Sequence, residues 1–255
     1  SGNTDILFGN VIGSNIANIF VILGMAVVIV PFNIKNEIIK KQIPILLLVT
    51  LGFSALFLDS FFDDRETNAL TRADGIVLLL FFSVFIYYLL TILKSSSEKG
   101  EVEAPKYKLP KSILIMLLGL AGVILASDMV VDNVAAFAAT IGISQKIITV
   151  TIISIGTSLP ELVTTVLAAK KGENNMAIGN IVGSNIFNIC VVLGLPVIIL
   201  GEAATVSFGY FDILFLVLSV IVAWVFASTN RALKRYEGFM MILVYCAYAG
   251  YIMWQ

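Results

Sequence analysis

Histidine is absent from the 255 residues, and cysteine occurs only twice, at Cys190 and Cys246. Without histidine the chain lacks the commonest general base, metal ligand and pH switch. Both cysteines lie in apolar runs and form no disulfide or metal-binding pattern. Charged residues make up only 13% of the chain and the net charge is −1, which excludes the strongly basic surface of a nucleic-acid-binding protein.

Apolar residues, by contrast, make up 59% of the chain, and the mean hydropathy is +0.99. A soluble protein of this length needs a larger polar surface, so the composition predicts an all-α polytopic membrane protein. Eight apolar segments are each near the ~20 residues that cross a bilayer. They are Ile6–Val30, Ile43–Leu58, Gly75–Leu93, Ser112–Ala139, Ile147–Ala169, Met176–Leu200, Phe208–Ala227 and Gly238–Trp254.

The polar loops between these segments carry basic residues unevenly. With eight spans, thirteen Lys and Arg residues fall on one side, and only Arg65, Arg72 and Lys146 fall on the other. The positive-inside rule makes the basic side cytoplasmic, so the C-terminus is expected outside. The longest and most charged loop, 94–111, is predicted to be a cytoplasmic linker between a first repeat, 1–93, and a second, 112–255.

One sixteen-residue motif occurs twice, as GNVIGSNIANIFVILG at 9–24 and GNIVGSNIFNICVVLG at 179–194, with eleven identical positions. Five predicted crossings separate the copies, so they should run through the membrane in opposite directions. Similar segments, Arg72–Gly75 and Arg235–Gly238, open the third and the eighth span. Inverted repeats of this kind are typical of alternating-access transporters.

The two halves differ in one respect. The second half has two apolar segments before its copy of the motif, whereas the first half has none. Symmetry therefore predicts about sixty further residues ahead of the first copy. We expect the chain to form eight helices of a ten-helix protein, with the missing N-terminal helices as its partners.

A carboxylate stands well inside the fifth segment, in the motif Gly156-Thr-Ser-Leu-Pro-Glu161. An unpaired charge is costly there, and the proline should free a carbonyl one turn earlier. Thr157 and Ser158 can share the side of a helix that carries Glu161. Such hard oxygen ligands suit Na⁺ or Ca²⁺ and not soft transition metals. The alternative, a proline kink with a glutamate bonded to a neighbouring helix, explains the combination less well.

The repeated motif adds neutral oxygens. Ser14 and Asn18 are four residues apart on one helix face, as are Ser184 and Asn188, and each can offer an oxygen to a cation. Interhelical hydrogen bonds or capping explain the other asparagines of the motif at least as well as ligation does. These are Asn10, Asn15, Asn180 and Asn185.

Each copy of the motif also contains a pair of glycines four residues apart, Gly9/Gly13 and Gly179/Gly183. Pairs of small residues at this spacing let a second helix approach closely in a membrane. Helix packing alone is therefore the better interpretation of these four glycines.

GTSLPE followed by GNIVGSNIFN, with a second GNVIGSN helix, resembles the α-repeats of the cation/Ca²⁺ exchanger superfamily, and most closely prokaryotic Na⁺/Ca²⁺ exchangers. The resemblance implies an inverted-repeat exchanger fold of ten helices in a prokaryotic plasma membrane. It also implies transported Na⁺ and Ca²⁺, no cofactor, and a cation site at mid-membrane. By this resemblance the ligands would be Glu161, Thr157, Ser158, Ser154, Ser184, Asn188, Ser14 and Asn18.

The chain departs from the family pattern at two points. The family's other central glutamate belongs to a first GTSLPE-type motif, which the 255 residues do not contain. Some relatives, including K⁺-dependent exchangers, have aspartate where this chain has Asn188. Asparagine lowers the charge of the site, which argues against K⁺ coupling.

Asp128 and Asp132, four residues apart in the fourth segment, are the other ionisable residues inside a predicted span. They could line an ion path. Contacts to a helix end or hydrogen bonds to neighbours are the better interpretation.

The function predicted from these features is Na⁺/Ca²⁺ antiport. A Ca²⁺/H⁺ exchanger using the same carboxylates is the nearest alternative, and a fragment that is inactive by itself is another. The inversion argues against a channel. An enzyme is not expected, because the sequence offers no histidine, no zinc-type cluster and no convincing nucleophile–base pair.

Overall fold

The computed structural model describes residues 2–58, 61, 68–98, 107–142, 156, 158–200, 204–206 and 210–254. Nearly all of them are helical, as the bilayer demands of backbone groups that cannot bond to water. Six helical stretches within this part are long and apolar enough to cross a membrane. They are Leu7–Ile29, Ile38–Phe57, Arg72–Ser95, Leu109–Thr140, Asn174–Ile199 and Tyr210–Thr229.

All of these stretches except the second begin and end within three residues of a span that the sequence predicts. The first half of the chain contains α1 (Gly2–Ala17), η1 (Asn18–Leu23), α2 (Gly24–Ile29), β1 (Phe32–Asn33), η2 (Ile38–Gln42), α3 (Ile43–Phe57), β2 (Asn68–Leu70) and α5 (Arg72–Glu98). The second contains α6 (Leu109–Thr140), α9 (Leu159–Lys170), α10 (Asn174–Phe187), η4 (Asn188–Leu193), α11 (Gly194–Leu200), β3 (Ala204–Val206), α12 (Tyr210–Asn230), β4 (Ala232–Leu233) and α13 (Arg235–Trp254).

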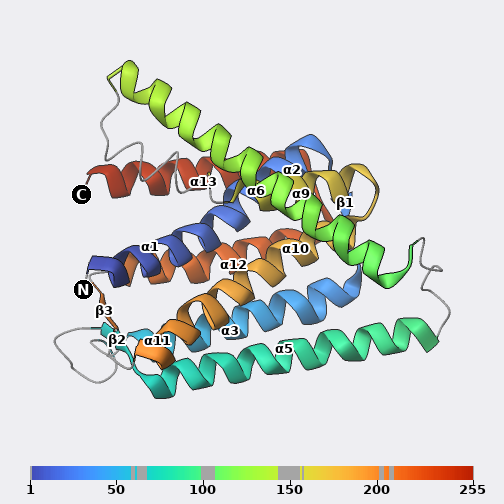
Figure 1. Cartoon of the computed structure of the whole chain (residues 1–255), viewed down its shortest axis with the longest axis horizontal. Helices are drawn as coiled ribbons and strands as arrows, with labels where there is room; N and C mark the ends of the chain where they lie inside the picture. The colour runs from blue at the N-terminus through green and yellow to red at the C-terminus, as the bar shows by residue number, and fades with distance from the viewer. Residues whose placement is uncertain are drawn as a thin grey trace.

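The two copies of the motif form α1–η1–α2 and α10–η4–α11, which run in opposite directions through the bundle (Figure 1). Two short ladders mark the two ends. β1, which follows the first copy, pairs with β4, and β3, which follows the second copy, pairs with β2 at the opposite end. The inverted repeat predicted from the sequence is therefore present in the fold.

Each copy packs against the last helix of the other half. A Cβ added at Gly238 of α13 would lie 2.6 Å from the backbone oxygen of Gly24, and one at Gly75 of α5 would lie 2.7 Å from that of Gly194. Glycine is required at such distances, because no side chain fits between the two backbones. The repeats are thus interleaved rather than set side by side.

The glycine pair of the second copy, Gly179/Gly183, does not show the close packing expected for it. A Cβ at Gly179 would meet only the side-chain oxygen of Gln42, at 3.8 Å, and one at Gly183 would meet no described atom within 4 Å. Within the described residues the packing interpretation therefore finds no support at this pair. Close backbone contacts between helices use Gly24 and Gly194, at the end of each copy, instead.

The fifth predicted span, Ile147–Ala169, is described only at Gly156 and from Ser158 onwards. α9 begins only at Leu159, because Pro160 lacks an N–H and fits best in the first turn of a helix. Residues 143–155 and Thr157 lie outside the described part. Pro160 therefore stands in the first turn of a helix, whereas the sequence placed it inside one continuous predicted span. α13, the eighth predicted span, is a helix of 20 residues but is not among the six stretches above.

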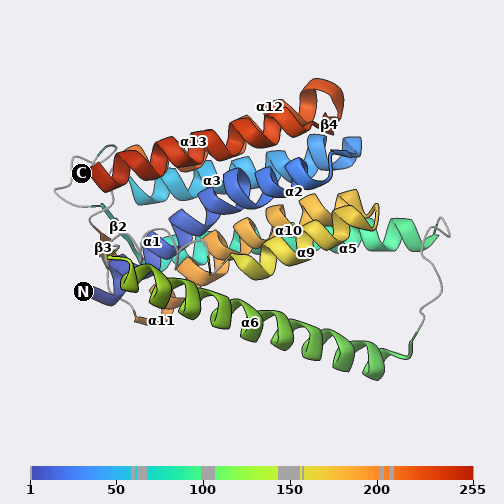
Figure 2. The same cartoon turned by 90° about the horizontal axis from the view of Figure 1, so that it is seen from above.

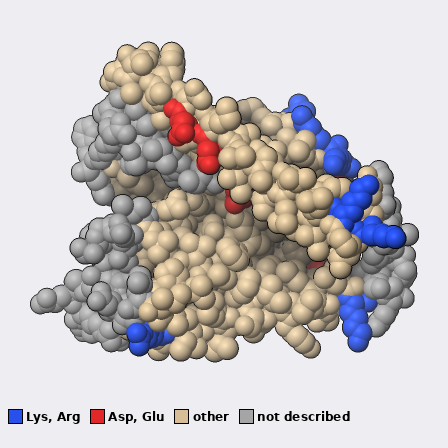
Figure 3. Space-filling view, in the orientation of Figure 1, with Lys and Arg blue, Asp and Glu red and all other residues tan. Residues whose placement is uncertain are grey.

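α6 is the longest helix, with 32 residues, and crosses the others obliquely. Figure 2 places it at one edge of the bundle, with α12 and α13 at the opposite edge. Asp128 and Asp132 are exposed on it, and acidic side chains lie over this helix in Figure 3. No described contact links either carboxylate to another element, so the expected hydrogen bonds to neighbours are not seen within the described residues.

Basic side chains gather at the end of the bundle where β1 and β4 pair (Figure 3). Lys35 follows β1, Arg231 and Lys234 flank β4, and Lys170 ends α9. Arg72 lies at the opposite end, beside β2. Basic residues from three of the loops that the charge bias assigned to one side of the membrane are therefore found together at one end of the described structure.

Candidate cation site

The start of α9 lies within the bundle and carries the carboxylate. Leu162 N–H donates to the backbone oxygen of Ser158, at 3.0 Å, which closes the first turn. Ser158 is buried, with 2% of its surface exposed, and Glu161 follows in that turn, partly buried. A carboxylate is favoured there, because the first N–H groups of a helix have no partners within it and carry partial positive charge.

α10 places a hydroxyl against this carboxylate. Ser184 Oγ donates to Glu161 Oε1 at 3.1 Å. One turn earlier on the same face, Asn180 Nδ2 donates to the hydroxyl oxygens of Thr164, at 2.9 Å, and Thr165, at 3.1 Å. Side chains four residues apart share a helix face, so α10 contacts α9 through a polar stripe, and Glu161 lies at one end of it.

Two asparagine pairs connect the two copies of the motif where they cross. Asn18 Nδ2 donates to Asn185 Oδ1 at 2.9 Å, and Asn188 Nδ2 donates to Asn15 Oδ1 at 3.2 Å. The pairs are equivalent, because Asn15 corresponds to Asn185 and Asn18 to Asn188 in the repeat. Asn185 Nδ2 also donates to the backbone oxygen of Asn15, at 3.1 Å. Of the interpretations left open for Asn15 and Asn185, the structure shows interhelical hydrogen bonding.

Each helix changes its winding at one of these asparagines, Asn18 in the first copy and Asn188 in the second. η1 begins at Asn18 and η4 at Asn188, and each is a six-residue π-helix that continues into an α-helix at a glycine. Wider turns of this kind are rare and occur frequently at functional sites. Their presence at equivalent positions identifies the crossing as a specialised part of both repeats.

One oxygen at the crossing has no partner within the described part of the chain. Asn18 Oδ1 is buried and accepts no hydrogen bond from a described residue, while Asn18 Nδ2 lies 3.5 Å from Ser184 Oγ as well as near Asn185. An unpaired buried carbonyl oxygen costs about 1–3 kcal/mol, so this atom is suited to accept a proton donor or a cation. Glu161, Ser184 and Asn18 therefore form a chain of contacts that ends in a free oxygen ligand.

The ligands predicted from the sequence fall into four groups. The structure brings Glu161, Ser184 and Asn18 together, whereas Asn188 uses its amide to bond Asn15. Ser14 and Ser158 are buried on α1 and at the start of α9. Thr157 and Ser154 lie outside the described residues. The sequence leaves the role of Asn180 open, and the structure shows that it bonds Thr165. Its four-residue spacing from Ser184 indicates that both side chains lie on one face of α10.

The described residues include no group of three or more His, Cys, Asp or Glu side chains that could hold a metal ion. The ligands available around Glu161 are one carboxylate with hydroxyl and amide oxygens. Hard oxygen donors of this kind suit Na⁺ and Ca²⁺, whose sites are completed by several neutral oxygens.

The chain matches the model of the family described as sodium/calcium exchanger protein over residues 1–91 and 111–254. It is 32% identical to the inner membrane protein YrbG of Escherichia coli over 260 residues, which cover 98% of this chain and 76% of that protein. It is 28% identical to the sodium/calcium exchanger MaX1 of Methanosarcina acetivorans over 280 residues, which cover 95% of this chain and 79% of that one.

The fold is also similar to a solved structure, that of the sodium-calcium exchanger NCX_Mj soaked with zero Na⁺ and Ca²⁺. The TM-score is 0.75 and the identity 28%, over 95% of this chain and 75% of the other. The similarity therefore includes both repeats and the crossing between them.

Proposed function

The chain belongs to the sodium/calcium exchanger protein family, and from that premise we propose that it exchanges Na⁺ for Ca²⁺ across a membrane by alternating access. The observation that carries the proposal is the cluster of Glu161, Ser184 and Asn18, to which both inverted copies of the motif contribute. A site built at the contact between inverted repeats is the arrangement used by many secondary transporters.

In this proposal Glu161 supplies the negative charge that attracts the cation. Ser184 and Asn18 supply neutral oxygens from the two copies, and the buried free oxygen of Asn18 is the atom best placed for a ligand. The remaining proposed ligands complete the coordination. They are Ser14, Ser154, Thr157, Ser158 and Asn188.

The energetic cost of moving the empty, charged site across the membrane explains why ions are exchanged and do not leak. Moving an uncompensated carboxylate through an apolar barrier is unfavourable, so Glu161 resists the transition unless a cation occupies the site. Ca²⁺ or Na⁺ relieves this cost, and the two compete for the same oxygens. Each change of access therefore carries one kind of ion in one direction.

The proposed orientation of the protein in the membrane follows from the uneven distribution of Lys and Arg. The end that contains Lys35, Lys170 and Arg231 faces the cytoplasm, and the C-terminus faces outside. Cysteine-accessibility labelling at Lys35→Cys and at Arg72→Cys in intact cells tests it. If the reagent outside the cell labels only position 72, the result supports this orientation. If it labels only position 35, the protein has the opposite orientation.

The activity is tested by Ca²⁺ uptake into vesicles that contain the purified protein. An outward Na⁺ gradient should drive uptake, and an equal K⁺ gradient should not. Uptake driven by a pH gradient without Na⁺ would favour the Ca²⁺/H⁺ alternative. Uptake that needs no counter-ion and does not saturate would indicate a channel and would contradict antiport.

The alternative that the 255 residues are inactive without the two helices predicted ahead of the first copy of the motif is tested with the same assay. The chain spans about three quarters of the length of the relatives named above. Vesicles are prepared with the 255 residues alone and with a longer polypeptide that includes upstream residues. Equal uptake by both would contradict the alternative that the 255 residues are inactive by themselves.

A further inference from the structure

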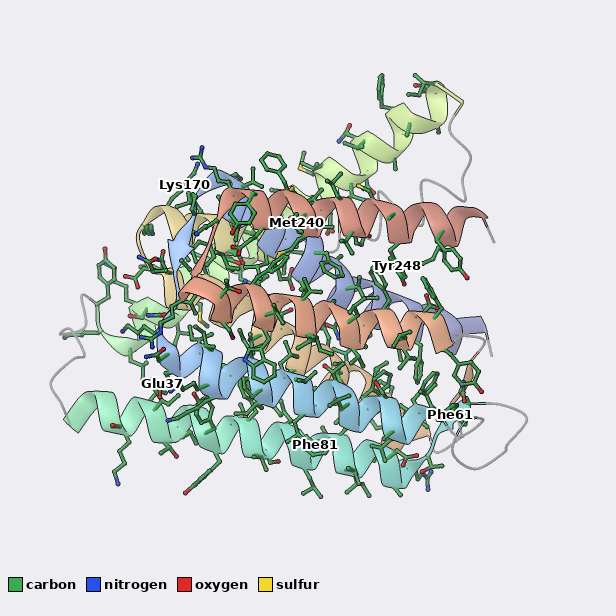
Figure 4. The ribbon with its side chains drawn as sticks, turned by 180° about the vertical axis from the view of Figure 1, so that it is seen from behind. Glu37, Phe61, Phe81, Lys170, Met240 and Tyr248 are labelled. Carbon is green, nitrogen blue, oxygen red and sulfur yellow. The ribbon has the colours of Figure 1, made fainter. Side chains whose placement is uncertain are left out.

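A groove opens on the face where α3 and α12 lie side by side, at the basic end of their seam. Figure 4 looks onto this face, with Glu37 near the basic end and Phe61 near the other. The groove has a volume of about 580 Å³ and is lined by Asn36, Lys40, Ser228 and Arg231, among others. This lies within the range of ~300–1,000 Å³ that is typical of small-molecule sites.

The two cations of the groove have no anionic partner among the described residues. The one ion pair found among the described residues joins Glu37 to Lys41, at 3.3 Å. No described carboxylate lies within 4.0 Å of the charged group of Lys40 or Arg231. Lys40 comes from the start of the α3 helical stretch and Arg231 from the residue after α12. Two unpaired positive charges from different elements therefore face one groove.

The backbone at Arg231 is held in a conformation that few residues adopt. Its φ is +53°, in the left-handed region, and it is the one non-glycine residue with positive φ in the described part. Its backbone oxygen accepts a hydrogen bond from Ile34 N–H at 2.7 Å, next to the β1–β4 ladder. Strain of about 1–3 kcal/mol at a non-glycine residue often accompanies a functional requirement for its side chain.

The groove lies at the level of a membrane surface. It is formed by the first residues of one candidate span, Ile38–Phe57, and the last residues of another, Tyr210–Thr229. Trp224 lines it and donates from Nε1 to the backbone oxygen of Ile39, at 3.0 Å. Partly exposed tryptophan is enriched at membrane–water interfaces, where its ring meets the acyl chains and its N–H the polar region.

The opposite end of the same seam has a different chemistry. There the rings of Phe61 and Tyr210 pack edge to face, with centroids 6.1 Å apart. The described residues of that end, Phe61 and Tyr210, contribute aromatic rings, whereas the end with Lys40 and Arg231 contributes two cations to the groove.

The geometry points to a binding site for a phosphate-bearing anion in this groove. Because the groove lies at the level of the membrane surface, the phosphate is best supplied by the headgroup of an anionic phospholipid. Lys40 and Arg231 bind the phosphate, and the side chains of Asn36 and Ser228 are available as hydrogen-bond donors. Basic pockets between membrane helices hold anionic headgroups in this way. Because the groove bridges α3 and α12, an occupant would fasten the two helices to each other.

The test measures the thermal unfolding midpoint of the purified chain in neutral detergent, titrated with short-chain phosphatidylglycerol. Phosphatidylcholine and inorganic phosphate are titrated in parallel. The variants are Lys40→Gln and Arg231→Gly, the second chosen because glycine adopts the backbone conformation of position 231 without strain. The matched control is Lys41→Gln, which changes the neighbouring lysine that is paired with Glu37.

Phosphatidylglycerol should raise the midpoint of the unaltered chain, and phosphatidylcholine should not. Half-saturation should need about tenfold more phosphatidylglycerol in each of the two groove variants and should be unchanged in Lys41→Gln. An equal response to inorganic phosphate would support the site and assign it to a soluble phosphate. A response that is the same in all three variants, or no response in the unaltered chain, would overturn the proposal.

Discussion

Asn18 of the first repeat donates a hydrogen bond to Asn185 of the second, 2.9 Å from Nδ2 to Oδ1. Asn188 and Asn15 make the equivalent bond in the opposite sense. Both pairs lie where the helices begin to widen into π-helices, next to Ser184 and the carboxylate of Glu161. The crossing of the repeats and the proposed cation site are therefore one structure.

Replacing Asn185 should destabilise the crossing. Asn185→Ala removes two hydrogen bonds and leaves the buried oxygen of Asn15 without one of its donors. We expect a loss of about 1–3 kcal/mol in the free energy of unfolding, measured by denaturant titration in detergent. Asn133→Ala, at an exposed position of α6, should change it by less than about 0.5 kcal/mol. Equal losses in both variants would contradict a structural role for the asparagine pairs.

The contact between Gly24 and Gly238 should tolerate no side chain. In Gly238→Ala the added Cβ would lie 2.6 Å from a backbone oxygen, so α13 must shift, at about 1–3 kcal/mol. Gly250→Ala on the same helix meets no described atom within 4 Å and should be neutral or stabilising by up to ~1 kcal/mol. Thermal unfolding in detergent distinguishes the two. If Gly238→Ala were as stable as Gly250→Ala, the helices would not approach as closely as described.

Asp74 should stabilise the start of α5 by capping. Its Oδ2 accepts hydrogen bonds from the backbone N–H and the hydroxyl of Thr71, both at 2.7 Å, and Glu237 accepts the equivalent bond from Lys234 N–H. Asp74→Ala should cost about 0.5–2 kcal/mol of unfolding free energy, and Asp74→Asn, which keeps an acceptor oxygen, should cost less. The order of the two variants in denaturant titrations is the measurement. A larger loss in the asparagine variant would exclude capping as the main role.

The free oxygen of Asn18 should contribute to cation binding. Asn18→Ala removes this oxygen, and we expect Ca²⁺ to bind about tenfold more weakly, which corresponds to ~1.4 kcal/mol. Isothermal titration calorimetry on folded protein measures the change, with Asn133→Ala as the control that should bind normally. Unchanged Ca²⁺ affinity in Asn18→Ala would remove this residue from the proposed ligands.

The sequence predicts the architecture because the motif and the charge bias are strong signals. Two copies of a sixteen-residue motif and the uneven distribution of Lys and Arg suffice to predict an inverted repeat, which the ladders β1–β4 and β2–β3 show. The similar segments at Gly75 and Gly238 indicated equivalent helices. Their contacts with Gly194 and Gly24 could not be predicted, because a repeat does not reveal which half each copy packs against.

The site was predicted in part. The four-residue spacing of Ser184 from Asn188 and of Ser14 from Asn18 assumes a regular α-helix, whereas the chain widens into a π-helix at both asparagines. No residue type in the motif signals that change. Asn15 and Asn185 were ambiguous for a related reason, since only the crossing angle of the two helices determines which amides meet.

The most direct test of the proposed exchange is Na⁺-driven Ca²⁺ uptake by Glu161→Gln in vesicles, beside Glu173→Gln as the matched control. Both variants replace a carboxylate by an amide. Glu161 lies in the cluster with Ser184, whereas Glu173 is exposed just after α9. Uptake should vanish in Glu161→Gln, because the neutral side chain no longer attracts the cation, and should persist in Glu173→Gln. Undiminished uptake by Glu161→Gln would contradict the assignment of the site.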